Sequence, residues 1–256
     1  MAHRAPEPED AVRRLPDMDS IETLRQIARP MVFQTGLRQA PFSLAGTWFM
    51  VRYRRTVFAL TARHVVRDHP ANQLLLFPTD ASTEVLRVSE WWNVADEEND
   101  QDRSDVFVVS IDFAHLSKRT RGRSSLVHLD PDASTQWFAN RHNSMFFLCG
   151  YPSSINKADY EHSRAETRQV LLAGSYTGPS ITDGVHALRL DNPLGIDFNG
   201  LSGAAVFGLQ HELHGDSKPR FCGMAIRGGA SAGVLHFLEA SVILQILGLA
   251  AARRQS

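Results

Sequence analysis

The chain has 256 residues, of which 43% are hydrophobic and 21% are charged, a composition that is ordinary for a soluble globular protein. Its formal net charge of −1 offers no basic field that would attract nucleic acid. The first residues lack the apolar segment of a secretory signal, and the longest apolar run, residues 242–252, is too short to span a bilayer. We therefore expect a protein with no nucleic-acid partner and no membrane partner.

The chain contains two cysteines, Cys149 and Cys222, and both lie in apolar sequence ("FFLCGY" and "RFCGMA"). Cysteines in such surroundings are more often buried free thiols than members of a disulfide. Together with the missing signal segment, this predicts a protein of a reducing compartment, a bacterial-type cytoplasm.

The N-terminal part, residues 1–30, is predicted to be a disordered tail followed by a short helix. Residues 1–17 are rich in Pro, Glu, Asp and Arg. The next segment, DSIETLRQIARPM, has apolar residues along one helical face, with Asp19 or Ser20 available as a cap. Pro30 is expected to stop this helix.

A first set of strands is predicted over residues 31–118. The segment GTWFMVRYRRTVFALTARHVV alternates apolar and polar residues around Arg54 and Arg55, which indicates a hairpin. QLLLFP, TEVLRVSEWW and SDVFVVSIDF follow at short spacing and are typical of strands in a barrel or sandwich.

Residues 119–140 contain several turn formers and are expected to connect this first lobe to a second one over residues 141–256. Six strands are predicted in the second lobe, in the segments SMFFLCGYP, RQVLLAGSYTG, VHALRLD, AAVFGLQ, RFCGMAI and AGVLHF. The chain closes with EASVILQILGLAAARR, whose apolar face predicts a helix. The predicted fold class is therefore all-β, with two lobes and a helix at each end.

One serine lies between two glycines in the segment DFNGLSGAAVFG, where Gly200 and Gly203 flank Ser202 and an apolar run follows. This pattern predicts a tight turn that presents Ser202 and then enters the core. A serine nucleophile needs a base, and the base works best when a third group fixes its tautomer. The first lobe offers His64, after the strand residues LTAR, and Asp105, before VFVVSID. A cleft between the lobes would hold all three.

These motifs, in this order, resemble those of trypsin-like (chymotrypsin-fold) serine proteases. LTARHVV resembles the histidine segment of that family, SDVFVVSI its aspartate strand and GLSGAAV its nucleophile turn. GMAIRG is similar to the strand that pairs with bound substrate, and AGVLHFLEASVILQIL to the last strand and C-terminal helix. The resemblance covers roughly residues 33–250. It implies two six-stranded β-barrel lobes and a serine endopeptidase that acts on a protein or peptide substrate.

The resemblance also implies a role for each matching residue. Ser202 is expected to be the nucleophile, His64 the general base and then the general acid, and Asp105 the residue that orients His64. The backbone N–H groups of Gly200 and Ser202 are expected to form the oxyanion hole. Such a site needs neither a cofactor nor a metal ion.

The substrate pocket is implied by the same resemblance. Six residues before the nucleophile, where trypsin-type enzymes have an acidic residue, this chain has Ile196. Gly228 and Gly233 match the pocket walls, and Ile226 and Arg227 lie on the strand that would pair with substrate. An apolar floor with open walls predicts cleavage after an apolar residue (P1), large aliphatic or aromatic.

Leu201 departs from the family pattern, because secreted members have there an aspartate that pairs with a newly cut N-terminus. Activation by that route is therefore not expected. Two alternatives stay open: a catalytically silent peptide-binding module, and a latent protease whose oxyanion turn becomes ordered only when a protein partner binds. The complete set of His64, Asp105, Gly200 and Ser202 argues against the silent module.

Two other motifs are weaker. HELH, His211–His214, superficially resembles a zinc site, but the metalloprotease pattern needs two histidines four residues apart on a helix. A solvated hairpin loop is therefore favoured there. GLSGA does not match the G-x-S-x-G pattern of α/β-hydrolases, since its second glycine comes one position early.

Overall fold

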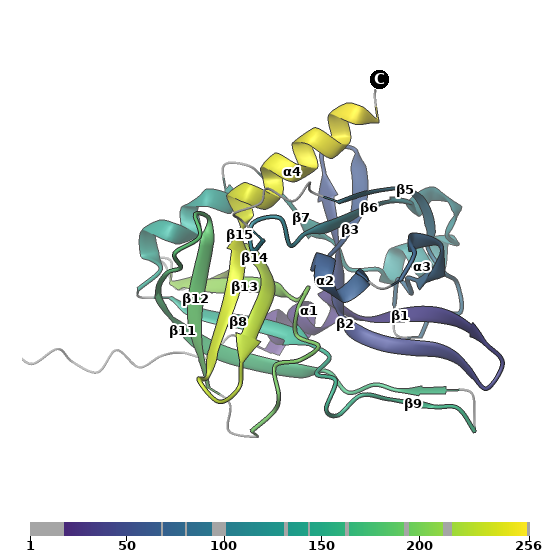
Figure 1. Ribbon diagram of the computed structural model, residues 1–256. Coiled ribbons are helices and arrows are strands. Elements are labelled where there is room, and N and C mark those ends of the chain that lie inside the picture. Colours follow the sequence, from purple (N-terminus) through teal and green to yellow (C-terminus); the bar gives the residue numbers. More distant parts are fainter. Residues whose placement is uncertain are drawn as a thin grey trace, which may run out of the picture.

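A computed structural model describes residues 18–67, 69–79, 81–93, 101–130, 133–142, 144–161, 164–191, 195–211 and 217–254. The chain is mostly β, with an open sheet, a closed six-stranded barrel, and helices near both ends (Figure 1). This arrangement confirms the all-β prediction and is compatible with a chymotrypsin-like fold. The predicted disordered tail, residues 1–17, lies outside the described residues.

The first lobe is a seven-stranded sheet in the order β4-β1-β2-β3-β6-β5, with β7 paired to β2. Its strands are β1 (Ala28–Leu37), β2 (Ala40–Tyr53), β3 (Thr56–Thr61), β4 (Leu74–Leu75), β5 (Arg87–Asn93), β6 (Phe107–Asp112) and β7 (Val127–His128). The hairpin predicted around Arg54 and Arg55 is confirmed by β2 and β3. The closed six-stranded barrel expected for this lobe is not found, because β4 pairs over two residues and does not reach β5 in the described part of the chain.

The second lobe is a closed barrel in the order β11-β12-β15-β14-β13-β8, as predicted. Its strands are β8 (Met145–Gly150), β11 (Val170–Pro179), β12 (Val185–Asp191), β13 (Ala205–His211), β14 (Ser217–Gly229) and β15 (Val234–Glu239). Large apolar side chains fill its interior, among them Trp137, Phe146, Leu188 and Phe237. A polar hairpin of β9 (Lys157–Asp159) and β10 (Arg164–Glu166) extends from this lobe beside β1 and β2 (Figure 1).

The two lobes share a core, because both faces of β2 are buried. Trp48 and Met50 pack into the first lobe, whereas Phe49 and Val51 belong to a cluster that also contains residues of the barrel. The ring of Phe49 lies 5.7 Å from that of Phe221 on β14. This shared core holds the end of β3 opposite the barrel, where the candidate site lies.

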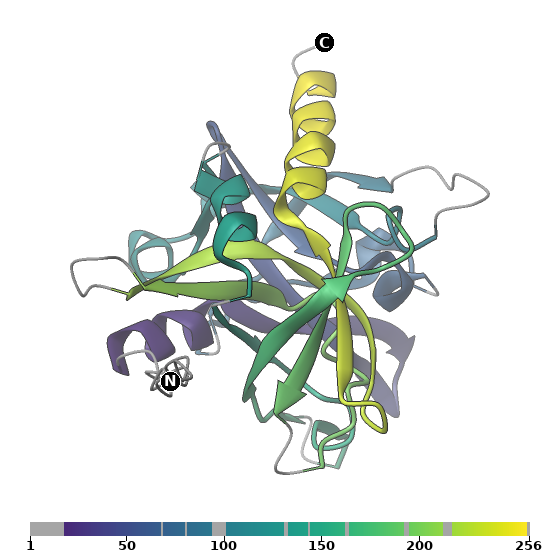
Figure 2. The same cartoon turned by 90° about the vertical axis from the view of Figure 1, so that its left-hand side faces the viewer.

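The helices are α1 (Met18–Ile27), α2 (Arg63–Val66), α3 (Lys118–Arg123) and α4 (Ala240–Arg253), with 3-10 turns η1 (Ala71–Gln73), η2 (Phe113–His115) and η3 (Ala133–Asn140). The predicted terminal helices are thus confirmed, and they lie on different sides of the molecule (Figure 2). Helix α1 ends at Ile27, before Pro30, which lies inside β1. Proline restricts the residue before it, Arg29, to extended backbone angles, so the helix cannot run into Pro30, in agreement with the predicted stop.

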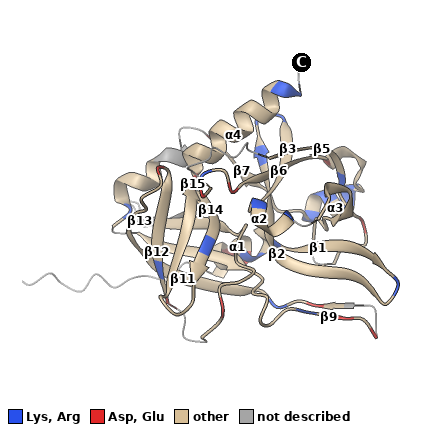
Figure 3. Ribbon diagram, in the orientation of Figure 1, with Lys and Arg blue, Asp and Glu red and all other residues tan. Residues whose placement is uncertain are grey.

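The predicted connection between the lobes, residues 119–140, contains more structure than turns. Most of α3, all of η3 and β7 fall within it, and β7 adds to the first sheet in parallel with β2. The basic residues of α3 form a visible group, while other charges are spread over both lobes (Figure 3).

Cys149 and Cys222 are free and buried, as predicted, and burial raises the pKa of both thiols. In the described residues no helix is long and apolar enough to cross a membrane. The same residues contain no group of three His, Cys, Asp or Glu side chains arranged to hold a metal ion. His211 ends β13, and the rest of the HELH motif lies outside the described residues.

Candidate active site

His64 and Asp105 meet because β3 and β6 are antiparallel neighbours, with Thr61 opposite Phe107. His64 lies in α2, just after the end of β3, and Asp105 lies just before β6. His64 Nδ1 is 2.7 Å from Asp105 Oδ2, and the backbone N–H of His64 donates to Oδ1 at 2.9 Å. Asp105 thus binds both the ring and the backbone of His64.

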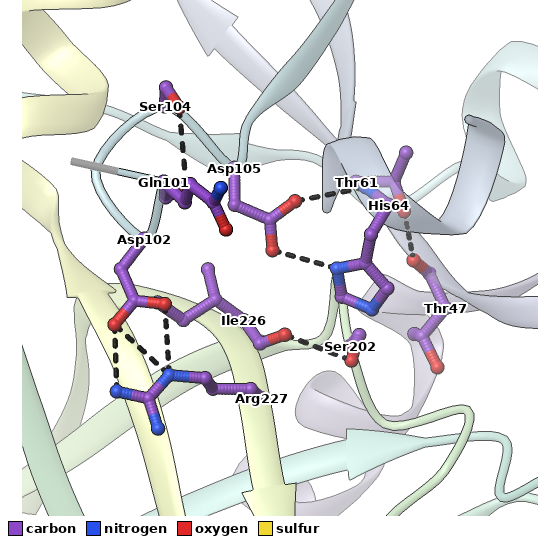
Figure 4. A network of polar contacts seen from close by, with 10 residues as sticks. All are labelled: Thr47, Thr61, His64, Gln101, Asp102, Ser104, Asp105, Ser202, Ile226 and Arg227. Atoms are coloured by element: carbon purple, nitrogen blue, oxygen red, sulfur yellow. Dashed lines mark hydrogen bonds and ion pairs between the residues drawn. The ribbon is translucent and has the colours of Figure 1, made fainter. Parts of the chain in front are cut away.

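This contact sets the tautomer of the ring. An ionised carboxylate can only accept a hydrogen bond, so the Nδ1 of His64 carries the proton and the Nε2 of a neutral ring has a free lone pair. The Asp105 side chain is 14% exposed, whereas that of His64 is 47% exposed. The ring is therefore held from behind and open on the side toward Ser202, where Figure 4 shows it lying between the two residues.

Ser202 lies in a segment of two overlapping turns, residues 198–204, which we call the nucleophile turn. The N–H of Leu201 donates to the carbonyl of Phe198 at 3.0 Å, and that of Ala204 donates to the carbonyl of Leu201 at 3.0 Å. The third residue of each turn is a glycine with positive φ, +91° at Gly200 and +87° at Gly203. Hydrogen bonds and dihedrals of this kind define type II turns, which require glycine at that position.

The two glycines also leave no room for a side chain. A Cβ atom at Gly203 would lie 2.0 Å from the carbonyl oxygen of Thr47, and one at Gly200 would lie 2.4 Å from that of Tyr151. Gly200 and Gly203 are therefore required both by their backbone angles and by the backbones packed against them.

The N–H groups of the nucleophile turn are mostly used within the protein. Those that donate to described acceptors are the groups of Asn199, Leu201, Gly203 and Ala204. Within the described residues, the N–H groups of Gly200 and Ser202 donate no hydrogen bond. These two are the donors that the resemblance implies for the oxyanion hole.

The hydroxyl of Ser202 donates to the carbonyl oxygen of Ile226 at 3.1 Å. The Ile226 carbonyl is left out of the pairing between β14 and β15, because β14 has a bulge between Ala225 and Arg227. No hydrogen bond joins Ser202 to His64 in the described structure, although the two side chains face each other (Figure 4). In sites without ligand such contacts are often longer than in the reacting complex.

Arg227, predicted to lie along the substrate, is engaged by Asp102. Its guanidinium donates to both carboxylate oxygens of Asp102 at 2.7–3.0 Å (Figure 4). Asp102 belongs to the loop before Asp105, and the N–H of Asp105 donates to the carbonyl of Asp102 at 3.3 Å. The ion pair therefore ties the barrel to the loop that carries Asp105.

A cavity of about 940 Å³ lies beside His64, between Asp102, Trp91 and Ile226. Arg63, next to the histidine, lines the same cavity. The cavity lies beside the His64 ring and beside the bulged strand β14, so it offers space for part of a bound peptide.

The three predicted pocket residues differ in burial: Ile196 is buried, Gly233 is half-buried and Gly228 is exposed. Ile196 is 7% exposed. At Gly228 a Cβ atom would lie 2.9 Å from the ring of Phe198, so the missing side chain makes room for that ring. Gly233 has φ +62° near the turn between β14 and β15. The pocket role of these residues stays a prediction.

Thr47, on β2, is a site residue that the sequence analysis missed. Its N–H donates to the carbonyl of Ser202 at 3.0 Å, and its hydroxyl donates to the carbonyl of Gly200 at 2.8 Å. The only sequence signal is one small polar residue before the apolar run WFMV, which is also typical of an ordinary strand.

Comparison with protein-family models finds no match to this chain, and comparison with curated proteins finds none either.

Proposed function

We propose that the protein is a trypsin-like serine endopeptidase that hydrolyses peptide bonds through His64, Asp105 and Ser202. One observation carries the proposal: two N–H groups of the nucleophile turn, those of Gly200 and Ser202, donate to no described residue and lie next to a histidine whose tautomer is set by a carboxylate. Acyl transfer needs a nucleophile, a base and donors for a developing oxyanion. A purely structural turn needs none of these together.

In the proposed first step, Ser202 Oγ attacks the carbonyl carbon of the scissile peptide while its proton passes to Nε2 of His64. The carbonyl electron pair moves onto the oxygen, which accepts hydrogen bonds from the N–H groups of Gly200 and Ser202. Asp105 stabilises the imidazolium without taking its proton. His64 then protonates the leaving nitrogen, the C–N bond breaks, and an ester to Ser202 remains.

The second step releases the ester with water. His64 takes a proton from the water, whose oxygen attacks the ester carbonyl, and the same N–H groups hold the second oxyanion. His64 returns the proton to Ser202 Oγ as the C–O bond breaks, which yields the free acid and the original enzyme.

A catalytically silent peptide-binding module is the second candidate function. The observation in its favour is the hydrogen bond from Ser202 to Ile226, which directs the serine proton away from His64. In the proposed endopeptidase, substrate that binds along β14 has to displace the hydrogen bond from Ser202 to Ile226. A backbone N–H of the substrate can then donate to the Ile226 carbonyl instead.

The preference for an apolar P1 residue belongs to the proposal as well. It rests on Ile196, which offers no charge to a basic side chain. Cleavage sites in a peptide library measure it, and a clear preference for Arg or Lys would contradict it.

Labelling with a fluorophosphonate, read by intact mass, tests the function without knowledge of the substrate. We expect one adduct on the wild-type protein and none on the folded Ser202→Ala and His64→Ala variants. An unlabelled wild-type protein that is folded favours the silent module. An adduct that persists in Ser202→Ala places the reactive group elsewhere.

A further inference from the structure

We propose that Thr47 is a positioning residue that fixes the nucleophile turn from the first lobe, so that the oxyanion hole is formed without a cut N-terminus or an activator. This inference rests on the proposed function. Thr47 lies on β2 of the open sheet and is fully buried, whereas the turn that it contacts belongs to the barrel lobe. It is therefore a link across the boundary between the lobes.

The Thr47 hydroxyl serves two backbone groups at once. It donates to the carbonyl of Gly200 at 2.8 Å and accepts from the N–H of Tyr151 at 3.0 Å. A hydroxyl has both a donor and acceptor lone pairs, so threonine or serine can make both contacts and valine can make neither. Without the hydroxyl, the carbonyl of Gly200 would lose the partner that holds it.

Two contacts fix the peptides on either side of Gly200: one from Ser153 to the peptide that contains the Gly200 N–H, and one from Thr47 to the peptide that follows. The carbonyl of Asn199, in the peptide before Gly200, accepts from the N–H of Ser153 at 2.7 Å. In a trans peptide the N–H and C=O groups point in opposite directions, so this bond turns the N–H of Gly200 away from Ser153. Thr47 holds the peptide on the other side of Gly200. Both peptide planes next to the oxyanion donor are therefore fixed.

The backbone of Thr47 completes the link. Its N–H donates to the carbonyl of Ser202, and its own carbonyl accepts from the hydroxyl of Thr61 at 2.7 Å. That carbonyl occupies the space where a side chain at position 203 would lie. The carbonyl groups of Gly200 and Ser202 are thus held by Thr47 on β2, and the carbonyl of Thr47 is held by Thr61 on β3.

Leu201 supports the turn by apolar packing. It is fully buried in the barrel core, and its Cδ2 lies close to Gly150, where a Cβ atom would be 2.8 Å away. At this position an aspartate would need a charged partner, whereas leucine is held by apolar packing. Among the described residues the nucleophile turn is held by hydrogen bonds and apolar packing and by no ion pair, so these contacts need no new amino terminus.

The experiment compares Thr47→Val, which removes the hydroxyl but keeps the branched shape, with Thr47→Ser, which keeps the hydroxyl. Ser110→Ala is the matched control, because Ser110 is a fully buried hydroxyl of the same lobe that is hydrogen-bonded to Ser89 and Arg254, away from the site. The full-length proteins are assayed alone, by fluorophosphonate labelling rate and then by kcat and KM on an activated peptide ester.

We expect Thr47→Val to lower the labelling rate and kcat by about 10- to 100-fold, since loss of one oxyanion donor costs about 10²–10³ and a displaced donor costs less. KM should change less than about twofold, and the pH midpoint of kcat should stay, because none of the described hydrogen bonds of Thr47 goes to His64. Thr47→Ser should restore the rate to within about threefold. Ser110→Ala should lower the melting temperature and leave the labelling rate unchanged.

Equal labelling of folded Thr47→Val and the wild-type protein would overturn the inference alone. An equal loss of labelling in Ser110→Ala would also overturn it, because the loss would then come from lower stability. A shifted pH midpoint of kcat would overturn it as well, because the loss would then come from His64. If Thr47→Val does not fold, Thr47→Ala removes the same hydroxyl and takes its place. A folded wild-type protein that acquires no adduct on Ser202 would instead overturn the proposed function, and this inference with it.

Discussion

The two lobes contribute to the candidate site in different ways. The first lobe supplies side chains, His64 and Asp105, from short segments that follow or precede strands. The barrel supplies a backbone turn whose shape depends on two glycines. In the first lobe the chemistry depends on which side chains are present, whereas in the barrel it depends on Ser202 and also on the absence of side chains at Gly200 and Gly203. Removing side-chain atoms should therefore damage the part of the site in the first lobe, and adding them should damage the turn in the barrel that presents Ser202.

The largest effect is expected when either reacting side chain is removed. Ser202→Ala and His64→Ala should each lower kcat by about 10⁶-fold, because the nucleophile and its base act as a unit. The double variant should be no worse than either single variant. Rates on an activated peptide ester, with circular dichroism as a check on folding, measure this, and additive losses would contradict a shared role.

Asp105→Asn should lower kcat by about 10⁴-fold. The amide can donate to Nδ1 of His64 and so favour the tautomer whose Nε2 carries the proton and cannot accept one from Ser202. The fold should be retained, because the isosteric side chain can still accept the backbone N–H of His64 through its oxygen. A loss smaller than tenfold would mean that Asp105 does not set the tautomer.

Gly203→Ala tests the other half of the comparison by adding one methyl group. We expect it to abolish labelling and to lower the free energy of unfolding by about 3 kcal/mol or more, from the positive φ and the contact with the Thr47 carbonyl together. Gly36→Ala is the matched control, because Gly36 has φ +75° but no atom within 4 Å of its Cβ position. It should cost about 1 kcal/mol and leave labelling intact. Equal effects in urea unfolding would contradict the role of the contact.

The smallest effect is expected in a pair that makes no hydrogen bond to the site residues in the described structure, His186 and Glu239 of the barrel, whose Nε2 and Oε2 atoms are 3.1 Å apart. The hydrogen bond from His186 lowers the pKa of Glu239 below its ordinary value of 4.5, against the opposing effect of burial. A lowered carboxyl pKa stabilises the folded protein above the unfolded-state value, and this contribution is lost as the pH falls through the folded-state pKa.

Urea unfolding between pH 7 and pH 3 measures this contribution in the wild-type protein and in Glu239→Gln. The variant should lose less stability on acidification and should label like the wild-type protein at pH 7. An unchanged acid slope would contradict the assignment. A loss of labelling would mean that the barrel end and the site are coupled.

Much of the barrel could be predicted from the sequence, because its six strands are short apolar runs separated by turn residues. The order of His64, Asp105 and Ser202 was also readable, since each lies next to such a run. The predicted hairpin of β2 and β3 places His64 at the end of β3. The pairing of β3 with β6 then brings His64 to Asp105.

The rest depends on features that leave little pattern. β4 and β7 have two residues each, and the β9–β10 hairpin is polar, so none of them shows an alternation that a sequence reveals. Thr47 acts through contacts with residues more than 100 positions away in the chain, at Tyr151 and Gly200. The partner of Arg227, Asp102, is likewise set by how the lobes meet and not by any local motif.

The most direct test of the central claim is to trap the acyl-enzyme. The full-length protein is mixed with a nitrophenyl ester of a peptide that ends in an apolar residue, quenched in acid, and examined by intact mass and peptide mapping. The account predicts a mass increase equal to the acyl group, located on Ser202, which disappears as the ester is consumed and never forms in Ser202→Ala. A folded wild-type protein that acquires no acyl group, or acquires it on another residue, would contradict the account.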